Sequence, residues 1–215
     1  ALLIETLAAI HGVDPDAVGL GDLGRPDGFF ARTAKGWLSR AERIGEGELS
    51  PAVRAIARWL EGVPEPARNA PTLLHNDFKL DNMLLDPKTL RPVAVVDWDM
   101  GTRGDPLFDL ATLLSYWTEA GDPDCMHRLA QMPTAKPGFA TREEAARAYA
   151  RATGRSLDDL KPYRVLTMLK LGVVFHQLHA RYRAGETTDE RYAPFGALGD
   201  ALLEFTLDIV NDKIF

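Results

Sequence analysis

The sequence predicts an α+β fold that is mostly α-helical, with a small β-hairpin embedded among the helices. Two observations lead to this fold class. Helix start signals recur along the chain, and only its middle part has an extended pattern. With 215 residues and 46% hydrophobic content, the chain can bury a core of its own. We therefore expect a single domain over residues 1–215.

The first half of the chain begins with three expected helices. Residues 1–11 form the first and residues 27–44 the second. The third begins at "SPAVRAIARWL". There Ser50 can cap the first turn, and Pro51 occupies the first helical position, where its missing N–H has no cost.

The second half repeats these helix signals. In "GDPLFDLATLLSYWTEA", Asp105 and Pro106 stand where Ser50 and Pro51 stand in the earlier helix. In "TREEAARAYARATG", Thr141 and Glu144 form a capping box, and a glycine ends the helix. The remaining expected helices cover residues 162–184 and 194–213.

The extended segments lie between the third and fourth helices. They read "TLL" (72–74), "NMLLD" (82–86) and "PVAVVDW" (92–98), and the turn "DPKTLRP" joins the last two. These segments are short, apolar or β-branched, and bounded by turn residues, which is typical of strands. We expect them to form a hairpin that carries the polar residues of the chain's middle.

Composition narrows the class of protein. The net charge is −6 with mixed signs, and neither a basic stripe for nucleic acid nor a Lys/Arg cluster for a membrane surface is seen. The single cysteine, Cys125, fits a reducing cytoplasm, and "GDPDCMHRL" reads as a loop entering a helix rather than a catalytic site. The chain lacks an initiator Met and opens inside a helix, so we expect a fragment of a longer protein.

A cluster of polar residues interrupts the apolar strands. His75, Asp77 and Asn82 lie between two short apolar runs, and Asp97 ends the next run. One interpretation is turn chemistry, in which these side chains satisfy loop backbone. The other is a divalent metal site: a hairpin would bring Asn82 and Asp97 together, and their oxygens suit Mg²⁺. Asp77 would then be free to accept a proton from a hydroxyl.

These residues resemble a known family. "HNDFKLDN" resembles the catalytic loop of protein-kinase-like phosphotransferases, in particular the aminoglycoside phosphotransferase and choline kinase group, and "VVDWDMGTRGDPLFDLA" resembles its metal-binding strand and following helix. "LAAIHGVDP", "VGLGDLGRPDGFFAR" and "WLEGVPEP" resemble the branch of kinase-like domains fused to acyl-CoA dehydrogenases. The resemblance implies the C-terminal, helical lobe of a protein-kinase-like fold.

The resemblance also implies roles for individual residues. Asp77 matches the general base in a catalytic loop over 74–82, and Asn82 and Asp97 match the metal ligands, the latter on a metal strand over 93–99. The implied cofactors are Mg²⁺ and ATP or GTP. Lys79 matches a lysine near the transferred phosphoryl group, although a solvated surface lysine is an equal alternative. His75 matches a structural histidine.

Several other polar residues have structural interpretations. Asp109 matches an Asp that supports the catalytic loop, and the helix dipole also favours it in a first turn. Asp99 is either a group behind the metal ligands or a solvent-facing turn residue. His176 and His179 could both bind a metal, but core or pocket lining is the better interpretation. Tyr116, Trp117, Phe175 and Tyr182 are expected in the core, with one or two touching substrate.

The function implied is transfer of the γ-phosphoryl group of a nucleotide to a hydroxyl of a small molecule. No glycine-rich strand–turn–strand precedes the catalytic loop, so the nucleotide-clamping lobe is expected to be absent and the fragment alone inactive. The alternatives are a non-catalytic kinase-like binding or regulatory module and a metal-dependent phosphohydrolase. The partners expected are a nucleotide, a small hydroxylated acceptor and, as a further possibility, a second copy of the chain. The acceptor's identity does not follow from the sequence.

Overall fold

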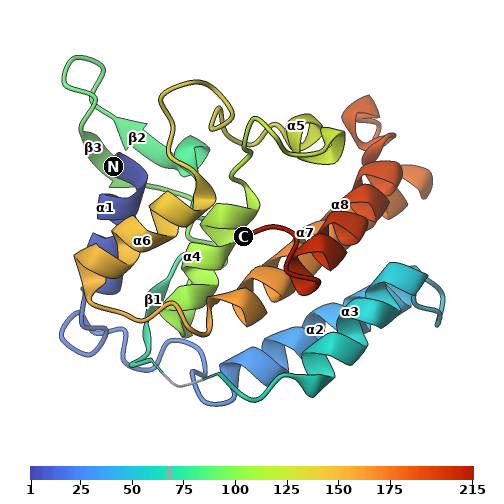
Figure 1. Cartoon of the computed structure of the whole chain (residues 1–215), viewed down its shortest axis with the longest axis horizontal. Helices are drawn as coiled ribbons and strands as arrows, with labels where there is room; N and C mark the ends of the chain where they lie inside the picture. The colour runs from blue at the N-terminus through green and yellow to red at the C-terminus, as the bar shows by residue number, and fades with distance from the viewer. Residues whose placement is uncertain (67–68) are drawn as a thin grey trace.

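Helix α7 (Leu160–Arg183) runs through the centre of the fold, and other helices pack along its length (Figure 1). The structure is a computed structural model that describes residues 1–66 and 69–215. The helices that contact α7 are α2 (Phe29–Ile44), α3 (Pro51–Gly62), α4 (Pro106–Ser115) and α8 (Phe195–Val210). The others are α1 (Leu2–His11), which packs on α6 (Arg142–Thr153), and the short α5 (Asp124–Leu129), which packs on α8. The expected α+β, mostly helical class is confirmed.

The predicted helix signals are confirmed by the caps observed. Ser50 accepts a hydrogen bond from the first turn of α3, and Asp105 does the same for α4. Thr141 and Glu144 form the complete capping box of α6, whose last turn is closed by Gly154 at a φ of +71°. These signals are local, because each cap bonds to backbone only two or three residues away. This is why the sequence alone could locate these helix starts.

The expected helix over residues 104–120 is shorter in the structure, because α4 ends at Ser115. The backbone then leaves the helix to make bonds with the loop that follows α5. The Trp117 indole donates to the carbonyl of Ala140 at 2.9 Å, and the Thr118 N–H donates to the Thr134 hydroxyl at 2.8 Å. These partners lie 23 and 16 residues away, so the helical pattern could not reveal them.

The strands form two separate sheets of two strands each, where we expected one hairpin. Strand β2 (Met83–Leu85) pairs antiparallel with β3 (Pro92–Val95), which confirms the hairpin itself. Strand β1 (Thr72–Leu74) pairs instead with β4 (Thr102–Gly104), a strand that the sequence did not predict. Its "TRG" is short and carries a charge in its centre, so it has no strand pattern of its own.

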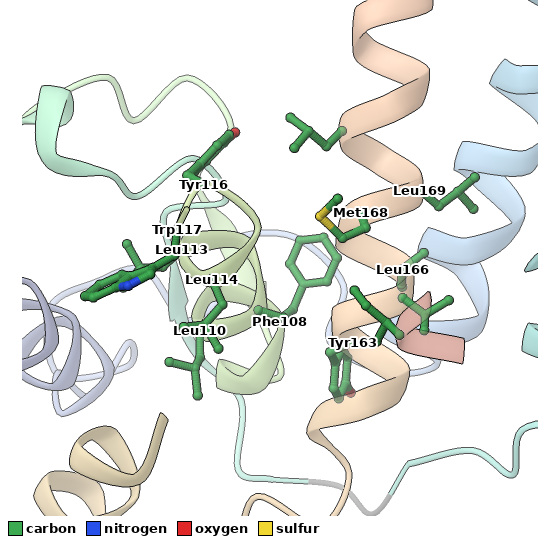
Figure 2. Close-up of a cluster of buried hydrophobic side chains, with 14 of the residues drawn as sticks. Phe108, Leu110, Leu113, Leu114, Tyr116, Trp117, Tyr163, Leu166, Met168 and Leu169 are labelled. Atoms are coloured by element: carbon green, nitrogen blue, oxygen red, sulfur yellow. The ribbon is translucent and has the colours of Figure 1, made fainter. Parts of the chain in front are cut away.

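The core lies where α4 and α7 face each other, and Figure 2 shows Phe108 between the two helices. Every residue of α4 is buried, including the polar ones. On the far side of α7, Gly172 allows close contact with α8: a Cβ there would lie 2.7 Å from Leu203 Cγ. The buried stretch of α7 contains charged residues. Among the described residues, no helix is long and apolar enough to span a membrane.

Two buried arginines differ in the hydrogen-bond partners of their guanidinium groups. Arg142, at the start of α6, donates to the Trp117 carbonyl at 2.8 Å and pairs with Asp122. Arg164, on α7, is equally buried, but its three guanidinium nitrogens have no hydrogen-bond partner among the described residues. Burial, followed by repulsion from Arg142, lowers the pKa of Arg164 to about 9. A charge without partners in the core should cost stability.

We predict that Arg164→Met raises the free energy of unfolding by about 1–3 kcal/mol, since it replaces an unpartnered charge with an apolar side chain. Urea denaturation at neutral pH measures the change. The matched control is Arg142→Met, which should lower stability by about 3–5 kcal/mol because it leaves Asp122 buried without its cation. A loss of stability in Arg164→Met would contradict the prediction.

Candidate active site

The segment between β1 and β2 carries the candidate site. The predicted catalytic loop (74–82) starts at the last residue of β1 and ends in a single 3₁₀ turn, η1 (Leu80–Asn82). Asn76 has a left-handed backbone, with a φ of +64°, which turns the chain sharply after the strand. Its side-chain amide donates to the Met100 carbonyl at 2.6 Å. The turn is therefore tied to the segment that follows β3.

Asp109 anchors the start of this loop through hydrogen bonds to its backbone. Its side chain is fully buried in the first turn of α4 and accepts hydrogen bonds from the backbone N–H groups of His75 and Asn76, both at 2.6 Å. His11 of α1 contacts the same carboxylate at 3.3 Å. The partners of His11 extend to α6, where its Nδ1 lies 2.6 Å from the Tyr149 hydroxyl. One buried carboxylate thus connects the loop to both α1 and α4.

Asp77 lies at the rim of the site with its side chain 19% exposed. Its Oδ1 accepts from the Tyr116 hydroxyl at 2.5 Å, and its Oδ2 accepts from Lys79 Nζ at 2.8 Å. Burial alone would raise the pKa of Asp77, but the hydrogen bonds from Lys79 and Tyr116 and the charges of Lys79 and Lys170 lower it below its usual value. The carboxylate is therefore ionised at neutral pH.

His75 joins the loop to the strand that precedes Asp97. Its Nδ1 accepts from the backbone N–H of Asp77 at 3.3 Å, so the proton sits on Nε2, which donates to the Val96 carbonyl at 2.9 Å. The ring also lies against Trp98, with centroids 4.7 Å apart. Since both ring nitrogens are used, His75 is placed to orient neighbours.

Asn82 and Asp97, the predicted metal ligands, flank the two paired strands: Asn82 lies just before β2, and Asp97 lies two residues after β3. The Val96 N–H donates to the Asn82 carbonyl at 2.9 Å, one residue before Asp97. The predicted metal strand (93–99) was too long, because β3 ends at Val95 and Asp97 adopts a left-handed φ of +66°. That turn ends the strand and leaves Asp97 exposed.

The donor set at this position fits Mg²⁺. The Asn82 amide nitrogen donates to the Asp77 carbonyl at 2.9 Å and to Asp77 Oδ2 at 3.2 Å. The Asn82 side-chain oxygen is therefore the atom left for a ligand, and Asp97 supplies a carboxylate. Hard oxygens of this kind suit Mg²⁺, which takes the rest of its shell from water and phosphate. In the part of the chain described, no group of three His, Cys, Asp or Glu side chains could hold a metal.

The other candidate residues lie apart from this cluster. Asp99 is exposed in the turn after β3. His176 pairs with Asp200 of α8 at 3.1 Å, and His179 Nδ1 lies 3.2 Å from the Tyr192 carbonyl. Cys125 is buried, and burial raises the pKa of its thiol. None of these side chains makes a hydrogen bond to Asp77, Asn82 or Asp97 in the described structure. The structure also corrects the lysine alternative, because Lys79 is only 18% exposed and is paired rather than solvated.

Three residues of the site were missed or misjudged from the sequence. Tyr116, which belongs to the group expected in the core with one or two members touching substrate, is the closest partner of Asp77. Lys170 of α7 donates to the Asn76 carbonyl at 2.5 Å. His11 reaches Asp109 from 98 residues away. For Lys170 a signal did exist: a lysine inside an otherwise apolar helix has to find a partner when it is buried.

Comparison with known proteins adds to this geometry. The model of the phosphotransferase enzyme family matches residues 1–163. Among curated proteins, acyl-CoA dehydrogenase family member 11 of Gallus gallus is 30% identical over 97% of this chain, and member 10 of Mus musculus is 26% identical over 98%. This chain spans only 27% and 20% of the length of these two relatives.

Solved structures show the same fold. A "putative aminoglycoside phosphotransferase" from Ralstonia eutropha has a TM-score of 0.84 and 25% identity, and the match covers 98% of this chain and 64% of that protein. An ethanolamine kinase of Plasmodium vivax has a TM-score of 0.57 at 11% identity, with 99% of this chain and 60% of that protein covered. The kinase-like fold expected from the catalytic loop and metal strand is therefore confirmed.

We predict that Asn82→Ala and Asp97→Ala each weaken the binding of Mn²⁺–ATP to the full-length protein at least about tenfold, or about 1.4 kcal/mol. The physical reason is the loss of one of two oxygen ligands. Electron paramagnetic resonance of Mn²⁺ measures the binding. Asp99→Ala is the matched control, because it removes an exposed acid two residues away and should leave the affinity unchanged. An equal loss in all three variants would refute the ligand assignment.

Proposed function

This chain belongs to the phosphotransferase enzyme family, and on that basis we propose that it forms the helical lobe of a kinase that acts on small molecules. The reaction proposed is transfer of the γ-phosphoryl group of ATP or GTP to a hydroxyl of the acceptor. One observation carries the proposal: the Asp77 carboxylate is held ionised at the rim of the site by Tyr116 and Lys79, next to the free amide oxygen of Asn82.

The two oxygens of Asp77 differ in what they can still accept. Oδ2 already receives Lys79 and Asn82, which uses the capacity of a carboxylate oxygen. Oδ1 receives only Tyr116, whose pKa is raised well above its ordinary value by burial and by the charge of Asp77, so the phenol stays a donor. We therefore assign Oδ1 as the atom that receives the acceptor's hydroxyl proton.

A lowered pKa makes Asp77 a weak base, and this fits phosphoryl transfer. The transition state of this reaction is loose, so the hydroxyl needs to be oriented more than it needs to be deprotonated early. Asn82 and Asp97 would hold Mg²⁺, which when bound would supply positive charge against the charge that develops on the phosphates. Lys79, which touches Asp77 and lies 5.1 Å from the Tyr116 ring, is close enough to contribute a second cation at the same rim.

The exposed apolar residues of the hairpin suggest where the rest of a longer protein would pack. The hairpin and the segment after it expose Leu84, Leu90, Val93, Trp98 and Met100 at 40% or more of their surface. By contrast, Leu74, His75 and Asn76 are buried, with contacts to α4 and α7. We propose that a nucleotide-clamping segment outside this chain covers the hairpin face, with a second copy of the chain as the alternative occupant.

We propose a small hydroxylated metabolite as the acceptor. The relatives named as acyl-CoA dehydrogenase family members make a hydroxylated acyl metabolite a reasonable first choice. A non-catalytic binding module remains the alternative function.

We predict that Asp77→Asn in the full-length protein lowers kcat roughly 10²–10⁴-fold, because the orienting carboxylate is lost. Nucleotide affinity should remain unchanged, since Asp77 is not placed as a metal ligand. Phosphate transfer from labelled ATP to a panel of hydroxylated metabolites measures kcat, and calorimetry measures affinity. Turnover equal to that of the unaltered protein would support the binding-module alternative.

We also predict that the 215-residue chain alone binds Mg–ATP weakly and does not turn it over. Phosphoryl transfer depends on positioning of the phosphates from both sides, and Asn82 and Asp97 supply only one. Isothermal titration with Mg–ATP is the measurement, and the full-length protein is the control. Micromolar binding with steady hydrolysis by the isolated chain would contradict this prediction.

A further inference from the structure

A single lysine stands in the buried middle of α7. Lys170 is 5% exposed, and its ammonium lies 5.6 Å from the ring of Phe108. Among the described residues, its ammonium donates a hydrogen bond to the carbonyl oxygen of Asn76, at 2.5 Å. An apolar side chain of similar volume would fill this space without the cost of burying a charge. The position of the ammonium therefore calls for an explanation beyond packing.

The bond from Lys170 fixes one side of the peptide group that leads into Asp77. The carbonyl of that peptide bonds to Lys170, and its N–H, which belongs to Asp77, donates to His75 Nδ1 at 3.3 Å. A peptide group is planar, so anchoring its oxygen and its nitrogen leaves its orientation no freedom. The left-handed Asn76 just before it would otherwise be a point where the chain could rearrange.

We propose that Lys170 is a positioning residue for Asp77: from α7 it anchors the Asn76–Asp77 peptide, and through that peptide it holds the Asp77 carboxylate in place. This inference rests on the proposed function in one respect, namely that Asp77 orients the acceptor. The anchoring itself follows from the contacts and can be tested without any substrate.

The charged groups around Lys170 come from two elements. Asp77 and Lys79 face it from the loop, and Asp109 faces it from α4. Burial is the main cause that lowers the pKa of Lys170, to about 8. The two carboxylates act in the opposite direction, and the charge of Lys79 lowers the pKa a little further. The ammonium is therefore charged at neutral pH and loses its proton as the pH rises through about 8. Above that pH both the bond to Asn76 and the attraction to Asp77 weaken.

The first test measures the anchored peptide itself. Amide hydrogen exchange, followed by NMR, gives the opening of the Asp77 N–H in this chain and in Lys170→Met. We expect exchange to be on the order of tenfold faster in Lys170→Met, because the oxygen of the same peptide group has lost its anchor. The matched control is Lys161→Met, which removes a cation from the same helix about 13 Å further along its axis and should leave the exchange of Asp77 unchanged. Equal exchange rates in Lys170→Met and Lys161→Met would overturn the proposal.

The second test uses the full-length protein with Mg–ATP and water as the acceptor, followed by phosphate release. Lys170→Met should lower kcat about 10- to 100-fold with little change in the KM for ATP, since only the orientation of Asp77 is affected. Lys170→Arg should recover part of kcat, and the fall in rate above about pH 8 that we expect of the unaltered protein should be absent in this variant. A kcat in Lys170→Met equal to that of the unaltered protein would overturn the proposal.

The two tests separate the proposals. If Asp77→Asn hydrolyses Mg–ATP as fast as the unaltered protein, the proposed function fails, while hydrogen exchange still decides whether Lys170 anchors the Asn76–Asp77 peptide. If Asp77→Asn is inactive and Lys170→Met behaves like Lys161→Met in both assays, the function stands and the role of Lys170 is refuted. Thermal melting of each variant excludes loss of the fold as the cause.

Discussion

The candidate site depends on two buried, opposite charges that hold the same short piece of backbone. Asp109 accepts the N–H groups of His75 and Asn76, and Lys170 donates to the carbonyl of Asn76. The two charges also attract each other. Burial lowers the pKa of Lys170, and the negative charge of Asp109 partly offsets that lowering. Each alone would be costly to bury, but together they satisfy backbone groups that a sharp, left-handed turn leaves without partners. The turn and the charges therefore require one another.

The rest of the fold supports Asp109 and Lys170, the two residues that hold this turn. Helix α4 carries Asp109, α7 carries Lys170, and the two helices are locked by a core that includes Phe108 and Tyr163 (Figure 2). Helix α1 adds His11 to the same carboxylate. Asp77 and Asn82 follow this turn along the chain, and Asp97 is exposed after β3. A fixed backbone next to the candidate reacting groups is what catalysis by positioning would require.

How much of this could be predicted from the sequence depended on the distance between interacting residues. Helix starts at Ser50, Asp105 and Thr141 were predictable because each cap bonds within its own first turn. The β2–β3 hairpin was predictable for the same reason, as its turn is short. The pairing of β1 with β4 was missed, because it joins residues about thirty apart through segments of three residues with no strong pattern.

The same dependence on distance in the sequence holds for the candidate site. The spacing of His75, Asp77, Asn82 and Asp97 could be recognised because these residues lie close together in sequence, whereas Tyr116 and Lys170 reach the loop from 39 and 94 residues away. Tyr116 and Lys170 add to the lowering of the Asp77 pKa by Lys79, Tyr116 bonds to one of the carboxylate oxygens, and Lys170 bonds to the peptide group that precedes Asp77. Residue types at fixed spacing thus identify the reacting groups of such a site. Their protonation and orientation are set by partners that only the folded chain brings together.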